Sequence, residues 1–284
     1  MQEAPARCYN EWNRIGLLVS MAPKHGMDSP PLDRLAPTRR PAGRAIGYQR
    51  WSDLLFIHWR FPAEVVAGCL PPSLALDNWQ GDAWVGLVLF RMSDVRPWWS
   101  CSLPWLSAFP ETNLRTYVHF QGREPGVWFF SLEAANPVAV AIARWLWALP
   151  YYWARMRVDE RARTIRYASR RRRPGPAVGT TVAADVAQPG PSQTVRSALP
   201  ETLDHFLIER YVLYSQDAHG RLWRGQVHHR PYPLEDARLT ECDENLCRAA
   251  GLPVPTAAPA HVAFSRGVKV EIFPLVPLDP RSTG

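Results

Sequence analysis

One short segment of the sequence gathers carboxyl, amide, guanidinium and phenol side chains at regular spacing. It reads Glu-Thr-Asn-Leu-Arg-Thr-Tyr from Glu111 to Tyr117 and follows a stretch rich in tryptophan and proline. In an extended strand, Asn113, Arg115 and Tyr117 lie on one face. An arginine on such a face binds a carboxylate or carbonyl oxygen, and Glu111 beside it can orient that ligand. The segment therefore predicts a site for a small carbonyl or carboxylate compound.

The same residues also allow a structural interpretation. Glu111 and Arg115 carry opposite charges and would then pair with each other to close the edge of a sheet. No spacing rule in the sequence decides between a pair of this kind and a ligand site, so both interpretations stay open.

Two further candidates are less specific. His228 and His229 are adjacent, so in a regular strand they point to opposite faces and cannot both bind one ligand. We take His228 as the histidine that lines a pocket, and a structural or surface role for the pair is the alternative. Arg144 is the single charge in an apolar predicted helix and needs a partner if it is buried.

Several kinds of active site have no support in the sequence. It contains no glycine-rich phosphate loop, no Gly-x-Ser-x-Gly turn and no His-Glu-x-x-His pair. Cys242 and Cys247 lie five residues apart, which fits neither a zinc site nor a redox motif. We therefore expect no metal, no cofactor and a reducing, cytoplasmic location. No apolar run reaches the ~18 residues that a membrane span needs.

The elements that must position these residues are mostly short strands. Proline occurs 28 times in 284 residues, which disfavours long helices. Apolar or alternating runs predict strands over 53–60, 83–92, 113–121, 127–132, 155–158, 164–169, 177–186, 211–215, 221–229 and 261–273. Helices are predicted over 62–70, 136–149, 201–209 and 243–250. The pattern indicates an α+β domain with a large, mostly antiparallel sheet, and the apolar helix over 136–149 is expected to be buried on several sides.

Composition and charge divide the chain into a domain and two ends. Residues 1–44 mix proline, arginine and serine without periodicity and predict a disordered extension; 45–276 form a single domain and 277–284 a tail. Of the net charge of +7, much lies in residues 155–173, where nine arginines face only two acidic residues. The simpler interpretation is a solvated hairpin, and the alternative is a surface for an acidic partner. We do not expect nucleic acid, and a homo-oligomer is compatible with the sequence.

Seven sequence blocks occur in a specific order. They are W-S-D-L-L-F-I-H-W, L-P-P-S-L-A-L-D, F-P-E-T-N-L-R-T-Y-V, G-V-W-F-F-S-L-E-A, A-R-W-L-W-A-L-P-Y-Y, T-L-D-H-F-L-I-E-R-Y and S-R-G-V-K-V-E-I-F. In these blocks the chain resembles the YqjF-like family, a bacterial domain of unknown function grouped with the acetoacetate decarboxylase-like superfamily. The resemblance covers about residues 48–275. It implies a β-cone or closed antiparallel barrel with a few short helices packed outside and a central cavity for small oxo acids.

The sequence departs from the superfamily at the residues that carry decarboxylation. Acetoacetate decarboxylases form a Schiff base through a lysine whose pKa is lowered by a second lysine and an apolar pocket. The matching place in this chain holds Tyr151 and Tyr152, and a phenol cannot form an iminium with a ketone. A later glutamate of these enzymes matches Glu111, whereas an earlier carboxylate falls near Val88. Lys269 lies in a predicted strand, where a lone lysine is usually solvated.

The resemblance and these departures together predict a pocket that binds a small carbonyl or carboxylate ligand without Schiff-base decarboxylase activity. Its predicted catalytic groups are Glu111, as acid, base or hydrogen-bond anchor, and Tyr151, as a phenolic donor. The predicted ligand-binding residues are Arg115, Asn113, Arg144 and His228. The alternative is a non-catalytic interaction module that binds an acidic partner through residues 155–173.

Overall fold

Strands make up most of the computed structural model, which describes residues 32–103, 107–172, 176–186 and 195–278. The strands are β1 (Gly47–Phe61), β2 (Leu74–Leu76), β3 (Ala83–Pro97), β4 (Phe109–Phe120), β5 (Arg123–Ala134), β6 (Tyr151–Arg161), β7 (Thr164–Arg171), β8 (Gly179–Val186), β9 (Val212–Gln216), β10 (Leu222–His229), β11 (Leu234–Glu235), β12 (Ala237–Glu244), β13 (His261–Ile272) and β14 (Val276–Pro277). The helices are η1 (Ala36–Thr38), α1 (Ala63–Ala67), α2 (Pro137–Trp147), α3 (Leu203–Ile208) and α4 (Leu246–Ala249). None of the helices in these ranges is long and apolar enough to cross a membrane.

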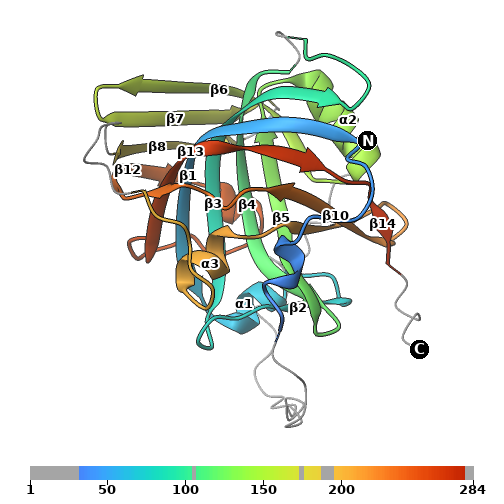
Figure 1. Cartoon of the computed structure of the whole chain (residues 1–284). Coiled ribbons are helices and arrows are strands. Elements are labelled where there is room, and N and C mark those ends of the chain that lie inside the picture. Colours follow the sequence, from blue (N-terminus) through green and yellow to red (C-terminus); the bar gives the residue numbers. More distant parts are fainter. Residues whose placement is uncertain (1–31, 104–106, 173–175, 187–194, 279–284) are drawn as a thin grey trace.

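Seven of the described strands form a ring. Hydrogen-bonded neighbours follow the order β5-β9-β10-β13-β1-β3-β4, and β4 pairs again with β5, which completes the circuit. All pairings in this ring are antiparallel except β5–β9, which is parallel. The observed ring of strands with few short helices agrees with the architecture that the resemblance implies (Figure 1).

A second sheet extends from the ring. It begins where β6 pairs in parallel with β5 and continues through β7 and β8 to β12 (Figure 1). Alternate residues of β7, including Ile165 and Tyr167, are buried in one cluster with Ile57 of β1 and Leu87 of β3. The second sheet therefore covers the outer face of part of the ring, and burial of this apolar surface is what joins the two layers.

The opposite faces of the ring strands form the interior cluster, which we define by Phe56, Phe90, Tyr117 and the residues packed with them. The side-chain period of two in each strand separates this interior cluster from the outer one, because consecutive residues point to opposite faces. In β1, for example, Phe56 belongs to the interior cluster and Ile57 to the outer one.

Helix α3 contacts the interior cluster directly. Thr202 caps its start, accepting a hydrogen bond from the backbone amide of His205 over 3.3 Å. Phe206 and Leu207 are fully buried in the interior cluster, so this helix covers the ring interior instead of packing on an outer face. Its backbone is thereby brought against side chains from the ring strands.

Helix α2 begins at the predicted cap but ends at Trp147, before the predicted limit of residue 149, and it lacks the predicted burial. The Asn136 side chain accepts hydrogen bonds from the amides of the first turn, and Pro137 occupies the first position, as expected from the sequence. Only Val140 is buried, however, and Trp145 is 82% exposed. The expectation of burial on several sides is wrong, because α2 contacts β5 and β6 along one side and no other described element covers the rest.

The two ends of the domain pack against the ring beyond the predicted limits. The predicted disorder of residues 1–31 lies outside the described residues. Within 32–44, the Arg34 guanidinium is 2.5 Å from the Asp77 carboxylate, and the carbonyl of Pro37 accepts a hydrogen bond from Gln226. The packed region thus begins before residue 45. At the other end β14 pairs with β10, and residues 279–284 of the predicted tail lie outside the described residues.

Candidate functional site

Strand β4 carries the polar residues of the interior. Tyr117 lies in the interior cluster and Leu114 in the outer one, which confirms the predicted alternation. Glu111, Asn113 and Arg115 are all buried, with at most 8% exposure. A continuous polar row of this kind costs free energy unless each group finds a partner, so the contacts of each group decide what the row can do.

The register of the neighbouring strands places a histidine beside Arg115. His58 of β1 is opposite Gly86 of β3, and Gly86 is opposite Arg115 of β4. A Cβ atom at residue 86 would lie 3.0 Å from His58 Nε2 and 3.3 Å from the Tyr117 hydroxyl. Glycine at this position leaves room for the His58 ring, which a larger residue would force to shift.

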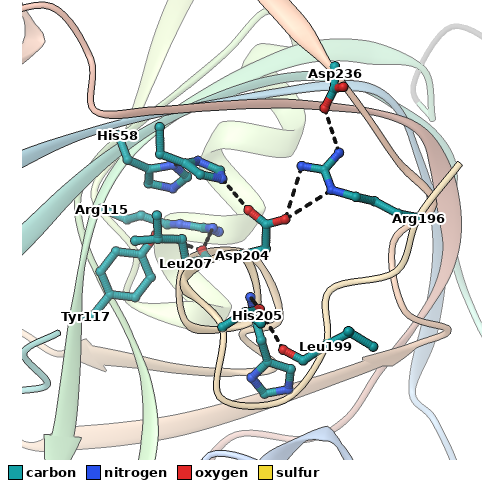
Figure 2. A network of polar contacts seen from close by, with 11 residues as sticks. His58, Arg115, Tyr117, Arg196, Leu199, Asp204, His205, Leu207 and Asp236 are labelled. Atoms are coloured by element: carbon teal, nitrogen blue, oxygen red, sulfur yellow. Dashed lines mark hydrogen bonds and ion pairs between the residues drawn. The ribbon is translucent and has the colours of Figure 1, made fainter. Parts of the chain in front are cut away.

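Arg115 and Tyr117 both bind the backbone of α3. Arg115 Nη2 and the Tyr117 hydroxyl donate hydrogen bonds to the Leu207 carbonyl over 2.9 and 2.8 Å (Figure 2). No ion pair joins Arg115 to Glu111 in the described residues, so the alternative in which these two residues pair at a sheet edge receives no support. Arg115 Nε and Asn113 Oδ1 are buried without a hydrogen-bond partner in the described structure. Such unsatisfied atoms are rare in protein interiors and remain available to a ligand.

Glu111 and Tyr151 form a second buried pair. The Tyr151 hydroxyl donates to Glu111 Oε2 over 2.8 Å. Burial, together with the nearby Glu133, raises the pKa of Glu111 to about 8, although the hydrogen bond from Tyr151 opposes this shift. A carboxyl group with this pKa is largely protonated at neutral pH and can exchange a proton with a ligand near that pH. The two predicted catalytic residues are thus brought together.

Tyr152 and Glu133 both contact Arg171. Tyr152 stacks under the Arg171 guanidinium at 3.7 Å, and Arg171 Nε donates to Glu133 over 2.8 Å. Both members of this ion pair are almost fully buried between β5 and β7. The pair connects the ring to the second sheet, so its role is structural, and only Tyr151 of the two tyrosines reaches Glu111.

A chain of polar contacts runs from His58 to α3. His58 Nδ1 is 3.0 Å from His261 Nδ1, and His261 Nε2 is 2.8 Å from Asp204 Oδ1. Asp204 in turn is paired with Arg196 at 3.1 Å, and Arg196 also binds the exposed Asp236 (Figure 2). His58 is fully buried, yet its Nε2 atom has no hydrogen-bond partner in the described structure. These contacts therefore connect the interior Nε2 atom of His58 to the partly exposed Asp204 and Arg196.

Two of the predicted ligand-binding residues do not face the interior. His228 is partly exposed, and its Nδ1 lies 3.4 Å from Glu271 on the side of β10 opposite to the interior cluster. The inward residue is His229, which is 3% exposed and stacks on Tyr211 with a ring-centroid distance of 4.3 Å. The period of two is correct, but the sequence offered no means of telling which histidine points inward. Arg144 is exposed on α2, so it is not one of the interior groups.

Sequence reasoning missed His58, His261 and Asp204. His58 and His261 lie in predicted strands, and Asp204 lies in a predicted helix, but these three residues are far apart in the sequence. The signal that joins them is the pairing of β1 with β13, in which His58 is opposite His261. Strand pairing over this separation is not encoded in the local pattern, so the cluster becomes visible only in the fold.

The outer face of the second sheet carries a groove of about 420 Å³. It is lined by Arg155, Met156, Arg157, Ala168, Ser169, Arg170, Ala177, Val178, Gly179, Thr180, Thr181, Asp243 and Asn245. Arg155 and Arg170 are directly opposite each other on β6 and β7, and neither has an ion pair within the described ranges. Like charges at such positions repel, so an anion between them would stabilise the sheet.

Comparison with known proteins places the chain in a family. The model of DUF2071, described as an uncharacterized conserved protein, matches residues 48–269. The chain belongs to the DUF2071 family. A similar DUF2071 relative is the uncharacterized protein YqjF of Bacillus subtilis (strain 168), with 34% identity over 229 residues, which cover 80% of this chain and 91% of YqjF.

Solved structures show the fold that this DUF2071 protein shares. An acetoacetate decarboxylase from Legionella pneumophila has a TM-score of 0.57 at 14% identity, covering 86% of this chain and 94% of that one. The enduracididine biosynthesis enzyme MppR, solved in complex with pyruvate, has a TM-score of 0.56 at 15% identity, covering 85% and 93%. The chain therefore has an acetoacetate decarboxylase-like fold. Lys269, the single lysine in its described part, is exposed.

Proposed function

We propose that this DUF2071 protein binds a small oxo acid or a related carboxylate without covalent attachment, in the interior of the strand ring. The observation that carries the proposal is the row of buried polar groups on β4, in which Arg115 Nε and Asn113 Oδ1 have no partner in the described structure. A buried guanidinium is a strong binder of carboxylate and carbonyl oxygens. Because Arg115 is already positioned by the Leu207 carbonyl, a ligand would meet an ordered donor.

Glu111 and Tyr151 supply the groups that could exchange protons with such a ligand. A pKa of about 8 keeps the Glu111 carboxyl largely protonated at neutral pH, so that it can donate a hydrogen bond to a carbonyl oxygen. The pyruvate complex of MppR, which has the same fold, supports the choice of an oxo acid as the first ligand to examine.

The proposal excludes Schiff-base chemistry because of the side chains present at residues 151 and 269. Tyr151 occupies the place at which the decarboxylases are expected to hold their lysine pair, and a phenol forms no iminium. Lys269 is exposed and lies between Val268 and Val270, which point to the interior, so its own side chain points away from it. Borohydride treatment with pyruvate or acetoacetate is expected to leave the mass of the protein unchanged. A covalent adduct would contradict the proposal.

Binding is tested by thermal shift with pyruvate on the unchanged protein and on matched arginine variants. Pyruvate is expected to stabilise the unchanged protein and R144Q, because Arg144 is exposed, but not R115Q. At a concentration 100-fold above Kd the expected stabilisation is about 2.7 kcal/mol. Since R115Q removes a buried charge, N113A serves as a second variant, and circular dichroism verifies that each variant is folded. Equal stabilisation of all four proteins, or of none, would contradict the proposal.

The groove on the second sheet favours a second candidate function, binding of an acidic partner. It combines Arg155, Arg157 and Arg170, and only Arg157 has a carboxylate partner, Asp159, among the described residues. Binding of this kind depends on salt because it rests on exposed charges. Retention on a polyanionic resin should fall with salt and should be lost in the R155Q/R170Q variant. Unchanged retention in that variant would exclude the groove as the binding surface.

A further inference from the structure

We propose that His58 Nε2 is the proton acceptor of the interior site, where it takes a proton from the carbon next to the carbonyl of a small oxo acid. His261 and Asp204 are positioning residues that hold His58 in the required tautomer. The proposal rests on the function proposed above, because it needs the oxo acid to be bound near Arg115.

The hydrogen bonds from Asp204 through His261 to His58 determine which ring nitrogen of each histidine carries a proton. The Asp204 carboxylate only accepts hydrogen bonds, so His261 Nε2 carries a proton and donates it over 2.8 Å. In the tautomer that we propose, His261 carries this single proton, which leaves its Nδ1 as an acceptor. The contact of 3.0 Å between the two Nδ1 atoms needs one donor, and this donor is His58 Nδ1. The lone pair of His58 therefore lies on Nε2.

Burial and the charges around His58 keep it neutral, so that its lone pair is available to accept a proton. Complete burial, with His261 of β13 and Arg115 of β4 nearby, lowers the pKa of His58 well below its usual value. On β3 the facing residue is Gly86, which has no charge, and on β4 Tyr117 donates its hydroxyl proton to Leu207. Asp204 is ionised, because hydrogen bonds from His261 and Arg196 lower its pKa. The carboxylate at the far end of the chain stabilises a proton that arrives at His58.

The interior position of Nε2 is what distinguishes His58 from a structural histidine. A buried histidine with a purely structural role usually has hydrogen-bond partners on both nitrogens. His58 has one on Nδ1 and none on Nε2 in the described structure; the same is true of His229, but His58 is the one in the cross-strand row of Arg115. Nε2 lies beside Gly86, in the cross-strand row that also contains Arg115, and we propose that a ligand held by this guanidinium presents its carbonyl side to the free lone pair.

The proposed proton transfer needs only the ligand and the residues of this site. The C–H bond next to the carbonyl breaks, its electron pair moves into the carbonyl group to give an enolate, and the proton goes to His58 Nε2. Arg115 stabilises the enolate oxygen. The Nδ1 proton of His58 can then pass to His261, whose Nε2 proton is shared with Asp204. The proton taken from carbon stays on Nε2; it is replaced by a solvent proton when the enol leaves and water reaches this nitrogen, and the reverse step on the next molecule then returns a solvent proton to carbon.

Histidine NMR tests the tautomer without any ligand. In long-range proton–nitrogen spectra of the full chain labelled with nitrogen-15 histidine, His58 should show a proton on Nδ1 and an unprotonated Nε2 at pH 7. The spectrum of the D204A variant should show a redistribution of the proton between the two nitrogens of His261 and of His58. A proton on His58 Nε2 in the unchanged protein would overturn the proposal.

Deuterium exchange tests the proton transfer. Pyruvate in heavy water should lose its methyl proton signal at least ~100-fold faster with the unchanged protein than with H58Q, the usual scale of general-base catalysis. H205Q is the matched control, since His205 lies on α3 but points away from His58 (Figure 2). D204N retains an oxygen that accepts from His261, so it should fold and bind pyruvate while exchange becomes slower.

Binding of pyruvate is measured on the same samples by thermal shift, which separates the two proposals. If pyruvate binds and exchange is equally fast with the unchanged protein and with H58Q, the role of His58 is wrong and the binding function stands. If pyruvate stabilises none of the proteins, the binding function fails, and with it the proton transfer. Exchange that is lost in H205Q as well would also overturn the assignment to His58.

Discussion

Glu111 illustrates how the position of a residue, more than its type, determines its chemistry. Most acidic residues in the described part of the chain are exposed to water or paired with an arginine. Glu111 meets neither, and its side-chain hydrogen-bond donor in the described structure is the neutral phenol of Tyr151. An arginine in place of Tyr151 would lower the pKa of this carboxyl and remove its capacity to donate a proton near pH 7.

The raised pKa of Glu111 predicts a pH-dependent loss of stability. Between the unfolded value of 4.5 and the folded value of about 8, the folded state holds the proton and the unfolded state does not. The free energy of unfolding therefore falls as pH rises through this window, by up to about 1.4 kcal/mol per pH unit. E111Q removes the titrating group and should lose less stability. Urea denaturation at pH 5 and pH 8 checks this, and parallel pH profiles of the two proteins would refute it.

The close approach of His58 to Gly86 predicts that one methyl group added at residue 86 lowers the stability of the protein. In G86A the new Cβ would lie 2.8 Å from the His58 ring, so the ring or a strand must shift, at a cost of about 1–3 kcal/mol. Gly68 is the matched control: the nearest atom to a Cβ there is 3.5 Å away, and G68A should be near neutral. Thermal unfolding of the two variants measures the difference. Equal stabilities would mean that the His58 ring is free to move.

At the level of elements, local patterns predicted most strands and helix limits, including the Asn136 cap of α2. They predicted the shared face of Asn113, Arg115 and Tyr117, because the side chains of a strand alternate between its two faces whichever strand it pairs with. They did not predict β12, whose sequence is polar and which is a strand through its pairing with β8. They also could not give the exposure of α2 or the meeting of His58 with His261, since both depend on neighbours that are distant in the chain.

One buried ion pair, Glu133 with Arg171, lies between the ring and the second sheet in addition to their apolar contact. Replacing Arg171 by methionine leaves the buried Glu133 without its partner between the layers, so R171M should lower the free energy of unfolding by about 3–5 kcal/mol. The E133L/R171M double variant removes both charges and should recover most of that loss. Denaturant titrations of the three proteins give the comparison. A double variant that is as unstable as R171M would show that packing, and not charge, joins the layers.

For the whole molecule, the ring topology predicts that removal of β13 abolishes the fold. A chain that ends at residue 258 leaves β1 paired only with β3 and β10 only with β9, and the two exposed strand edges favour aggregation. A chain that ends at Leu278 keeps all strands described here and is the control. Size-exclusion chromatography should give a folded species for the second chain alone. A monomeric, folded product from the shorter chain would contradict this prediction.

The pairing of β1 with β13 also has a consequence for synthesis on the ribosome. Gly47 of β1 is opposite Ile272 of β13, so the hydrogen bonds of β1 can be completed only after almost the whole chain has been synthesised. Contacts at such long sequence separation slow folding. During translation β1 and β3 can pair early, but the open side of β1 stays available to other nascent chains. Recruitment of a chaperone to polysomes that carry this message is the expected cellular consequence.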